Sequence, residues 1–246
     1  MGSLLVDMRN IHKWFGSVHA LRGVNFRVGY AESVGLVGDN GAGKSTLVKI
    51  LSGVYKPDAG EIYFKGKKVC FSSPREARES GIETIYQEQA LADDLSVVRN
   101  LFMGRELVKR VGPLKLLDHD RMKREGRKIL KELGLKIPSM DQEVRYCSGG
   151  ERQGIAIARA MYFKADLVIL DEPTRGLGIK GVRRVLDFIR ELKKNGIATI
   201  FVSHNLYHVY PVVDRFVILV RGRVVADVPK EKTSVDELAE IIAERG

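Results

Sequence analysis

The spacing of apolar residues changes twice along the chain. Up to about residue 71, short apolar runs separated by turn residues predict strands, with one amphipathic helix among them. The expected helix covers 44–51, and the expected strands cover 4–8, 24–28, 32–37, 60–64 and 69–71. Ser73-Pro74-Arg75-Glu76 then predicts another helix start, because it joins a capping box to a proline at the first helical position.

Helical spacing takes over between about 94 and 135, with a break at Gly112-Pro113 and a basic helix over 120–133. From residue 151 onward helices and strands alternate, which predicts a mainly parallel sheet. The expected strands here cover 167–170, 197–202 and 215–220, and the expected helices end near 163, 194 and 210. We therefore expect an α/β fold with a mainly parallel sheet, an N-terminal antiparallel β portion and an inserted helical subdomain.

The composition of the 246 residues excludes several classes of protein. The apolar runs, such as 216–220, are too short to cross a bilayer, and we expect neither a secretion signal nor a lipid anchor. Cys70 and Cys147 have no metal-ligand spacing and no set of partners for a disulfide framework. The net charge of +10 fits nucleic acid, an anionic membrane surface, or a lysine-rich surface of heat-tolerant type, and its spread along the chain favours the last.

A phosphate-binding loop is the most informative motif. Residues 38–45, Gly-Asp-Asn-Gly-Ala-Gly-Lys-Ser, fit the pattern G-x-x-x-x-G-K-[ST] between an apolar run and a helix-forming run. Glycines let the backbone approach phosphates closely, and the helix N-terminus that follows favours an anion. Lys44 adds a full charge and Ser45 a hydroxyl ligand for Mg²⁺. The residues expected to bind the nucleotide here are Gly38, Asn40, Gly41, Ala42, Gly43, Lys44, Ser45 and Thr46.

Two carboxylates, Asp171 and Glu172, follow the apolar run 167–170. Open α/β sheets bind ligands at the carboxyl ends of their strands, so this pair is expected beside the phosphate loop. Asp171 would then hold Mg²⁺, and Glu172 would orient or deprotonate the attacking water. The alternative is an acidic pair in an ordinary loop.

The segment Ser148-Gly149-Gly150-Glu151 precedes a helix rich in small residues. Ser148 and Glu151 form a capping box, which gives the segment a structural role. The two glycines at the same helix start also predict a second anion-binding site. Both roles are compatible.

The order of these motifs resembles that of the ATP-binding cassette (ABC) ATPases. Five motifs follow one another in the order seen in that family. They are the phosphate loop, Gln87 in Ile85-Tyr86-Gln87-Glu88, the Ser148-Gly149-Gly150 signature, Asp171-Glu172-Pro173-Thr174, and His204 in Val202-Ser203-His204. Five shorter segments further resemble the ATPase subunits of bacterial monosaccharide importers of the ribose, xylose and fructose type. These segments are residues 71–77, 81–88, 95–97, 104–106 and 117–118. The likeness covers essentially the whole chain.

The resemblance implies a P-loop NTPase core and a single nucleotide-binding domain over 1–246. Residues 1–90 and 155–246 would form the ATP-binding core with its β portion, and about 91–154 the helical subdomain with the signature. Phe15 would stack on adenine, with Trp14 as the less favoured candidate. Gln87 would contact Mg²⁺ or the attacking water, and His204 would contact the γ-phosphate.

The resemblance also implies how the chain works with its partners. Two copies would close head to tail around two ATP molecules, with Ser148, Gly149, Gly150 and Glu151 acting on the nucleotide of the other copy. ATP and Mg²⁺ are the implied cofactors. The chain would lie on the cytoplasmic face of the membrane, bound to permease subunits, with a sugar-binding protein as an indirect partner and no nucleic acid.

Two positions depart from the family pattern. By that resemblance, Cys147 stands where leucine is usual, and Gly178 replaces an aspartate that helps to couple the two sites. Two alternative functions stay open at this point: an ABC ATPase of DNA repair or translation, and a regulatory module that binds ATP without turnover.

Apolar residues between 87 and 103 fit either a groove for a permease helix or the core of the helical subdomain.

Overall fold

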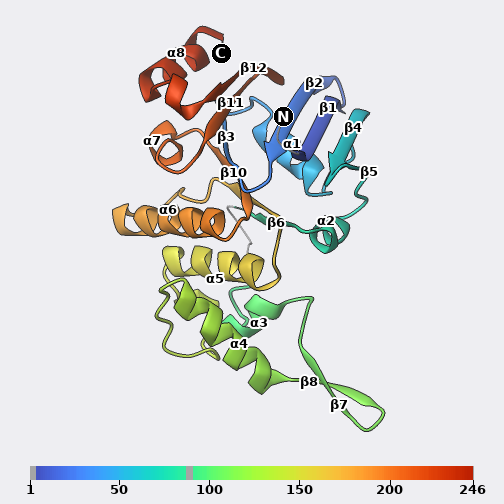
Figure 1. Cartoon of the computed structure of the whole chain (residues 1–246), viewed down its shortest axis with the longest axis vertical. Helices are drawn as coiled ribbons and strands as arrows, with labels where there is room; N and C mark the ends of the chain where they lie inside the picture. Colours follow the sequence, from blue (N-terminus) through green and yellow to red (C-terminus); the bar gives the residue numbers. More distant parts are fainter. Residues whose placement is uncertain (1–3, 87–90, 246) are drawn as a thin grey trace.

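A six-stranded sheet forms the centre of the molecule (Figure 1). The structure is a computed structural model that describes residues 4–86 and 91–245. All neighbouring strands of this sheet are parallel except β12 and β11 at one edge, which confirms the predicted mainly parallel sheet. The spatial order is β12 (Arg223–Pro229), β11 (Arg215–Val220), β3 (Ser33–Val37), β10 (Ala198–Ser203), β9 (Leu167–Asp171) and β6 (Ile82–Ile85).

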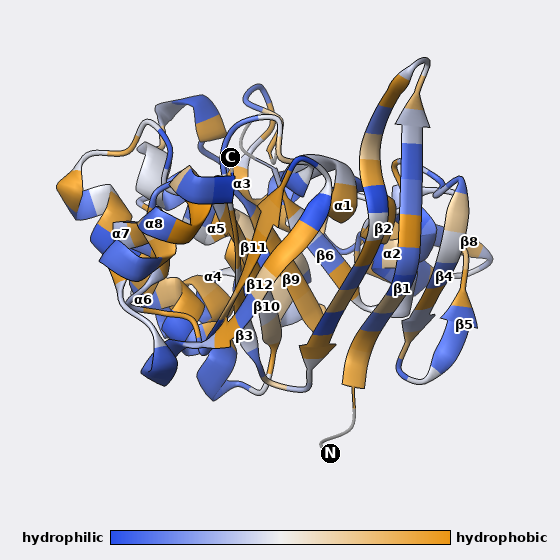
Figure 2. Ribbon diagram, turned by 90° about the horizontal axis from the view of Figure 1, so that it is seen from above, coloured by the Kyte–Doolittle hydropathy of each residue, from blue (hydrophilic) through white to orange (hydrophobic). Residues whose placement is uncertain are grey.

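The central strands are apolar along their whole length because both faces of the sheet are covered. Every residue of β3, β9 and β10 is buried, and Figure 2 shows the strands at the centre of the sheet as almost uniformly hydrophobic. Alternate side chains enter two different cores: Leu167 and Ile169 pack into one, and Val168 and Leu170 into the other.

A smaller antiparallel sheet shares the first of these cores with helix α1 (Lys44–Leu51). Leu47, Ile50 and Leu51 of α1 are buried there, as their helical spacing predicted. In Figure 2, strands β1 and β2 show alternating hydropathy, because only one of their faces meets the core. The order is β2 (Val18–Gly29), β1 (Leu4–Phe15), β4 (Ala59–Phe64) and β5 (Lys67–Val69), which confirms the N-terminal antiparallel portion.

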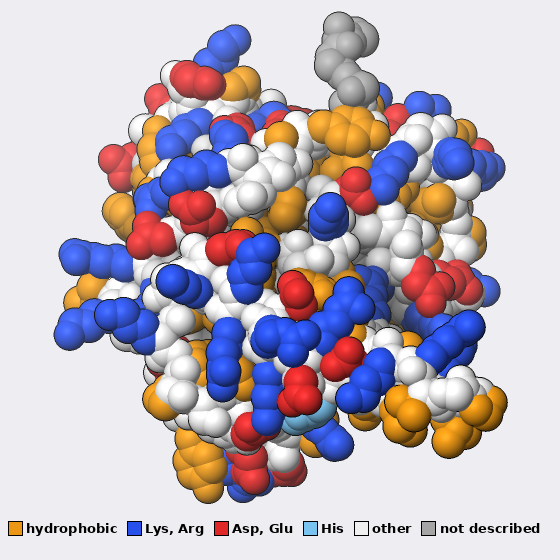
Figure 3. All heavy atoms as spheres, turned by 60° about the horizontal axis from the view of Figure 1, so that its bottom comes forward, with side chains coloured by type: hydrophobic (Ala, Val, Ile, Leu, Met, Phe, Trp, Pro, Cys, Tyr) orange, Lys and Arg blue, Asp and Glu red, His pale blue; other side chains and the backbone are white. Residues whose placement is uncertain are grey.

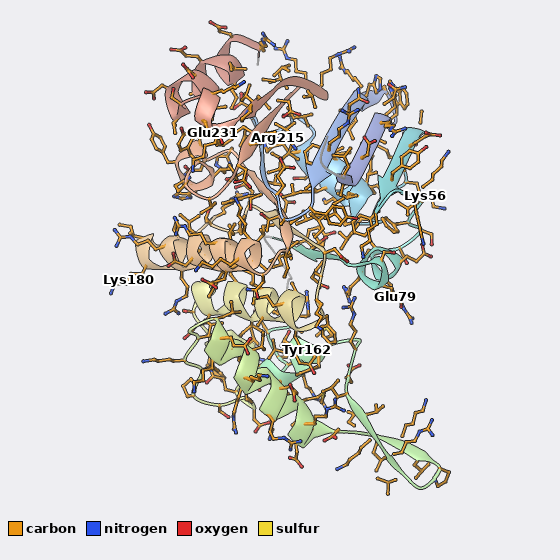
Figure 4. The ribbon with its side chains drawn as sticks, viewed as in Figure 1. Lys56, Glu79, Tyr162, Lys180, Arg215 and Glu231 are labelled. Carbon is orange, nitrogen blue, oxygen red and sulfur yellow. The ribbon has the colours of Figure 1, made fainter. Side chains whose placement is uncertain are left out.

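Helices fill the other core and form the lower part of the molecule in Figure 1. Phe102 meets Tyr162 edge to face with ring centroids 4.9 Å apart, and Figure 4 shows Tyr162 between α5 and the neighbouring helices. Within the described ranges, no helix is both long and apolar enough to span a bilayer. The helices are α2 (Pro74–Ser80), α3 (Val97–Phe102), α4 (His119–Glu132), α5 (Gly149–Tyr162), α6 (Ile179–Lys194), α7 (Leu206–Val209) and α8 (Val235–Arg245).

The predicted helix starts are confirmed by their caps. The Ser73 hydroxyl accepts a hydrogen bond from the Glu76 amide at 3.3 Å, with Pro74 at the first position of α2. Ser148 and Glu151 form the complete capping box of α5. These local signals succeed because each cap is made within four residues of chain.

The helical prediction around Gly112-Pro113 was wrong. Val108–Val111 and Leu114–Leu117 instead form an antiparallel hairpin, β7–β8, with Gly112 and Pro113 as its turn. The valines and the Gly-Pro pair favour this arrangement over a helix. The hairpin projects from the helical part of the molecule at the lower right of Figure 1.

Candidate nucleotide-binding site

Lys44 folds back over the loop that precedes it. It begins helix α1, and its Nζ donates hydrogen bonds to the carbonyl oxygens of Gly38 at 2.6 Å and Asp39 at 2.8 Å. Gly38 must be glycine, because a Cβ there would lie 2.1 Å from the carbonyl oxygen of Leu219. The loop is thus wrapped tightly, with its cation held at the start of the helix.

The ammonium group of Lys44 is a charge held away from water. Lys44 is 6% exposed, and burial lowers its pKa, while the carboxylates of Glu172, Asp171 and Asp39 oppose that fall. A buried cation near an open hollow gains from an anionic ligand. This environment suits the phosphates of a nucleotide.

Asp171 has a carboxylate oxygen available for a metal ion. The residue ends β9 and is 8% exposed; burial raises its pKa, Glu172 raises it further, and Lys49 and the Ser45 hydrogen bond lower it. Its Oδ1 is buried and has no hydrogen-bond partner in the described part of the chain. Hard oxygen atoms of this kind are the ligands that Mg²⁺ prefers, so Asp171 and Ser45 fit the predicted metal site.

Glu172 is held in a strained backbone conformation beside His204. Its φ of 50° is in the left-handed region, which disfavours a non-glycine residue by about 1–3 kcal/mol. Its Oε1 accepts a hydrogen bond from the His204 amide at 3.1 Å and lies 2.7 Å from His204 Nδ1. Its Oε2 accepts a hydrogen bond from the Ser203 hydroxyl at 2.8 Å. The two residues predicted as catalytic from separate motifs therefore lie together.

A cleft of about 460 Å³ unites the phosphate loop with the acidic pair. Asn40 to Thr46, Asp171 and Glu172 line it, all of which the sequence had indicated as site residues. Six further lining residues were missed: Val18, His19, Ala20, Arg22, Arg175 and Arg221. Arg175 follows the acidic pair directly, and its amide donates a hydrogen bond to the Glu172 carbonyl at 3.1 Å. No motif marks the other five, which reach the cleft from the β1–β2 and β11–β12 hairpins.

Arg221 lies on a turn that is fastened to the phosphate loop. The Gly222 amide donates to the Ala42 carbonyl at 2.9 Å, and the Arg22 amide donates to the Gly222 carbonyl at 2.8 Å. Arg221 has a φ of 44°, where asparagine, aspartate or glycine is preferred in a hairpin turn. The turn itself therefore does not account for arginine, whereas a cation at the cleft suits an anionic ligand.

The predicted adenine contact stays a prediction. Phe15 is 42% exposed and meets the ring of Tyr55 edge-on with centroids 5.3 Å apart, whereas Trp14 stacks on His19 at 4.0 Å. Phe15 does not line the cleft in the described part of the molecule, although Val18, its partner in the neighbouring strand, does. Gln87, the remaining predicted catalytic and metal-binding residue, lies outside the described residues.

The signature forms a separate hollow of about 420 Å³. Ser148, Gly149 and Gly150 line it together with Leu177 and Gly178, and none of the residues given for it lines the nucleotide cleft. Glu151 completes the capping box of α5, whose N-cap is Ser148, and its Oε2 accepts a hydrogen bond from the Ser148 amide at 2.8 Å. One copy of the chain does not bring these residues to its own phosphate loop.

Comparison with known proteins shows the family of the chain. The family described as ABC transporter matches residues 21–175, which is more than half of the chain. The chain belongs to the ABC transporter family. The ABC resemblance and the predicted fold class are therefore confirmed.

Curated relatives of this ABC protein carry sugar import names. The xylose/arabinose import ATP-binding protein XylG of Sulfolobus acidocaldarius is 44% identical over 238 residues, which are 97% of this chain and 93% of the relative. The fructose import ATP-binding protein FrcA of Rhizobium meliloti is 42% identical, with 96% and 92% covered. The ribose import ATP-binding protein RbsA of Bacillus subtilis is 36% identical over 95% of this chain, which spans only 46% of that relative.

Solved ABC structures share the fold. A nucleotide-free ATP-binding cassette from an ABC transporter superposes with a TM-score of 0.82 at 25% identity, covering 97% of this chain and 98% of that chain. The ADP conformation of MJ1267, an ATP-binding cassette of an ABC transporter, gives a TM-score of 0.82 at 24% identity, with 98% and 95% covered. Because the identity to MJ1267 is only 24%, that likeness shows a shared fold and nothing more.

The two departures from the ABC pattern have simple local settings. Cys147 is 6% exposed, and its Sγ accepts a hydrogen bond from Gln142 Nε2 at 3.3 Å, so it packs as a small buried residue. Gly178 precedes α6 as its N-cap without a side-chain hydrogen bond, and a Cβ there would meet nothing within 4 Å. The structure therefore has space for a Cβ at position 178.

The apolar residues between 87 and 103 belong mainly to the core. Val98, Leu101 and Phe102 are almost fully buried in the core of the helical part. These three residues fit the core alternative and are not available to line an open groove for a permease helix.

Proposed function

We propose that this chain is the ATP-binding and ATP-hydrolysing subunit that powers a membrane permease for a monosaccharide. The observation that carries the proposal is the meeting of Lys44, Asp171 and Glu172 in one cleft of an ABC chain. The import of xylose/arabinose and of fructose, which the names of the two most fully covered relatives state, supports the sugar class. The particular sugar would be chosen by other subunits.

The phosphate loop would bind the triphosphate through backbone amides and charge. The amides at the start of α1 and the buried Lys44 ammonium would face the β- and γ-phosphates. Ser45 and Asp171 would hold Mg²⁺ with Gln87, and the bound ion would neutralise charge that develops on the phosphates.

Glu172 would act as the general base. Its carboxylate would accept a proton from a water molecule as the water oxygen attacks the γ-phosphorus and the bond to the β-phosphate oxygen breaks, giving ADP and phosphate. The hydrogen bonds from Ser203 and the His204 amide hold the carboxylate in place. The His204 ring, beside Glu172 and half exposed, would contact the γ-phosphate.

The separate signature hollow supports a composite site made by two copies. Ser148, Gly149, Gly150 and Glu151 of one copy would complete the cleft of the other, giving a head-to-tail dimer with two ATP molecules between the copies. Within each copy, 1–90 and 155–246 would form the ATP-binding core and about 91–154 the helical subdomain. Permease subunits would hold the dimer at the cytoplasmic face of the membrane, with a sugar-binding protein as an indirect partner.

Steady-state phosphate release tests the proposal. Glu172→Gln should lower turnover by about 10²–10⁴-fold while ATP binding persists, because only the base is lost. Lys44→Ala should instead weaken ATP binding itself. Unchanged turnover in Glu172→Gln would show that Glu172 is not the general base. A wild-type chain that binds ATP without releasing phosphate would support the alternative of a regulatory module that binds ATP without turnover.

A further inference from the structure

The β7–β8 hairpin is exposed along both of its strands. Val108–Val111 pairs with Leu114–Leu117, and all eight strand residues are exposed. An isolated two-stranded hairpin is only marginally stable in water. Figure 3 brings this end of the molecule forward and shows hydrophobic side chains gathered at the lower right, where the hairpin lies, with basic side chains beside them.

Apolar side chains occupy both faces of the hairpin. Directly paired residues share a face and successive residues alternate, so Val108 and Leu117 lie on one face. Val111, Leu114 and Leu116 lie on the other, and the exposure of the five apolar residues runs from 45% at Leu116 to 62% at Leu114. A hairpin with apolar side chains on both faces can enter a lipid interface without turning a polar face toward the acyl chains.

The charges of the hairpin have one sign. Lys109, Arg110 and Lys115 are its only ionisable residues between Leu107 and Leu117, and no acidic residue occurs there. None of the three makes an ion pair within the residues that the structure describes. All three lie behind the turn, so that an apolar tip is followed by a ring of cations.

We propose that this hairpin is a membrane-binding element that places its apolar tip among the headgroups of anionic lipids. Val111 and Leu114 flank the turn and would enter the interface, while the three cations would meet the negative headgroups. This surface shares no residue with the nucleotide cleft, so the inference does not depend on ATP turnover. It accounts for an exposed apolar segment that would otherwise favour aggregation.

Sedimentation of the full chain with vesicles tests the proposal. Wild-type protein should bind phosphatidylcholine vesicles that contain phosphatidylglycerol and should bind pure phosphatidylcholine vesicles much more weakly. The combined change of Lys109, Arg110 and Lys115 to glutamine should weaken binding by about 100-fold, since each cation near an anionic surface contributes roughly 1 kcal/mol. Val111→Ser with Leu114→Ser should weaken it by about tenfold.

A matched control separates the hairpin from the net charge of the chain. Arg124, Lys128 and Lys131 are exposed cations on the neighbouring helix α4, and their change to glutamine removes the same charge. This control should retain most of the binding. An equal loss in the control, an absence of binding to anionic vesicles, or hairpin variants that bind like wild type would each overturn the proposal.

Two further measurements remove the remaining ambiguities. ATP binding should be unchanged in the hairpin variants, which shows that they are folded. Hairpin variants that bind vesicles normally but fail to co-purify with the permease subunits would make the partner a protein and would also overturn the proposal.

Discussion

The nucleotide cleft and the signature hollow are similar in size but opposite in chemistry. The cleft, of about 460 Å³, contains two carboxylates, a buried lysine and three arginines. The signature hollow, of about 420 Å³, contains no carboxylate among its described lining residues and is built largely from glycines, with Lys180 and Arg184 as its cations. Figure 4 shows Lys180 at the outer end of α6.

The difference indicates how the chemistry is divided. The cleft has carboxylates that could serve as a base and as oxygen ligands for Mg²⁺, whereas the hollow has backbone, a hydroxyl, cations and the apolar Leu177. An anionic ligand held between two copies would bring the two regions together, which is the arrangement proposed above.

Mixing two inactive variants gives the largest expected effect. Lys44→Ala disables the cleft and Ser148→Arg blocks the signature, so each variant alone should be inactive in phosphate release. A mixed dimer has one site with both halves intact, so an equal mixture should recover about a quarter of the wild-type rate. Failure of the mixture to recover activity, when the two variants are shown to form mixed dimers, would contradict the composite site.

Arg221→Asn should have a smaller effect, confined to the cleft. Asparagine tolerates the left-handed conformation of residue 221, so the turn should be kept while the cation is lost. We expect the affinity for ATP and ADP to fall about three- to tenfold, measured by titration with a fluorescent nucleotide. Arg223→Asn, on the adjoining strand and outside the cleft, is the control and should bind as wild type.

Asp171→Asn should stabilise the nucleotide-free protein while abolishing Mg²⁺-dependent hydrolysis. Burial raises the pKa of Asp171, so at neutral pH its ionisation disfavours the folded state. The melting temperature in the presence of a chelator should therefore rise in the variant. This difference in melting temperature between the variant and the wild type should shrink as the pH falls through the raised pKa of Asp171. The wild-type carboxyl is then protonated in the folded protein, so that it is as neutral as the asparagine of the variant. A lower melting temperature at neutral pH would show that the carboxylate is well compensated.

Gly178→Asp should produce the smallest change, at the signature hollow. Residue 178 is the N-cap of α6, and an aspartate there can accept a hydrogen bond from the helix start. Relative to glycine this adds only a few tenths of a kcal/mol to the free energy of unfolding, measured in urea. A change in the cooperativity of ATP hydrolysis would show that residue 178 affects the coupling between the two sites. A destabilised variant would show that position 178 cannot accept a side chain.

The sequence predicted best where a feature is made within one turn of chain. The bounds of the helices over 44–51 and 179–194 and of the strand over 215–220 agree with the structure, because their apolar patterns are local. The hairpin at Gly112-Pro113 was mistaken for helix, since short runs of mixed apolar and basic residues fit both periods. Strand β12 was missed because it depends on its pairing with β11.

The sequence alone therefore determined the fold class, the phosphate loop and the acidic pair, since these rest on short-range patterns and on the general rule that parallel strands end at one edge of a sheet. Tertiary structure alone decided that Arg221 and His19 reach the cleft, that Glu172 accepts a hydrogen bond from Ser203, and that the signature and the phosphate loop line separate hollows. These are meetings of residues far apart in sequence. No local pattern encodes them, because they depend on how strands and helices pack.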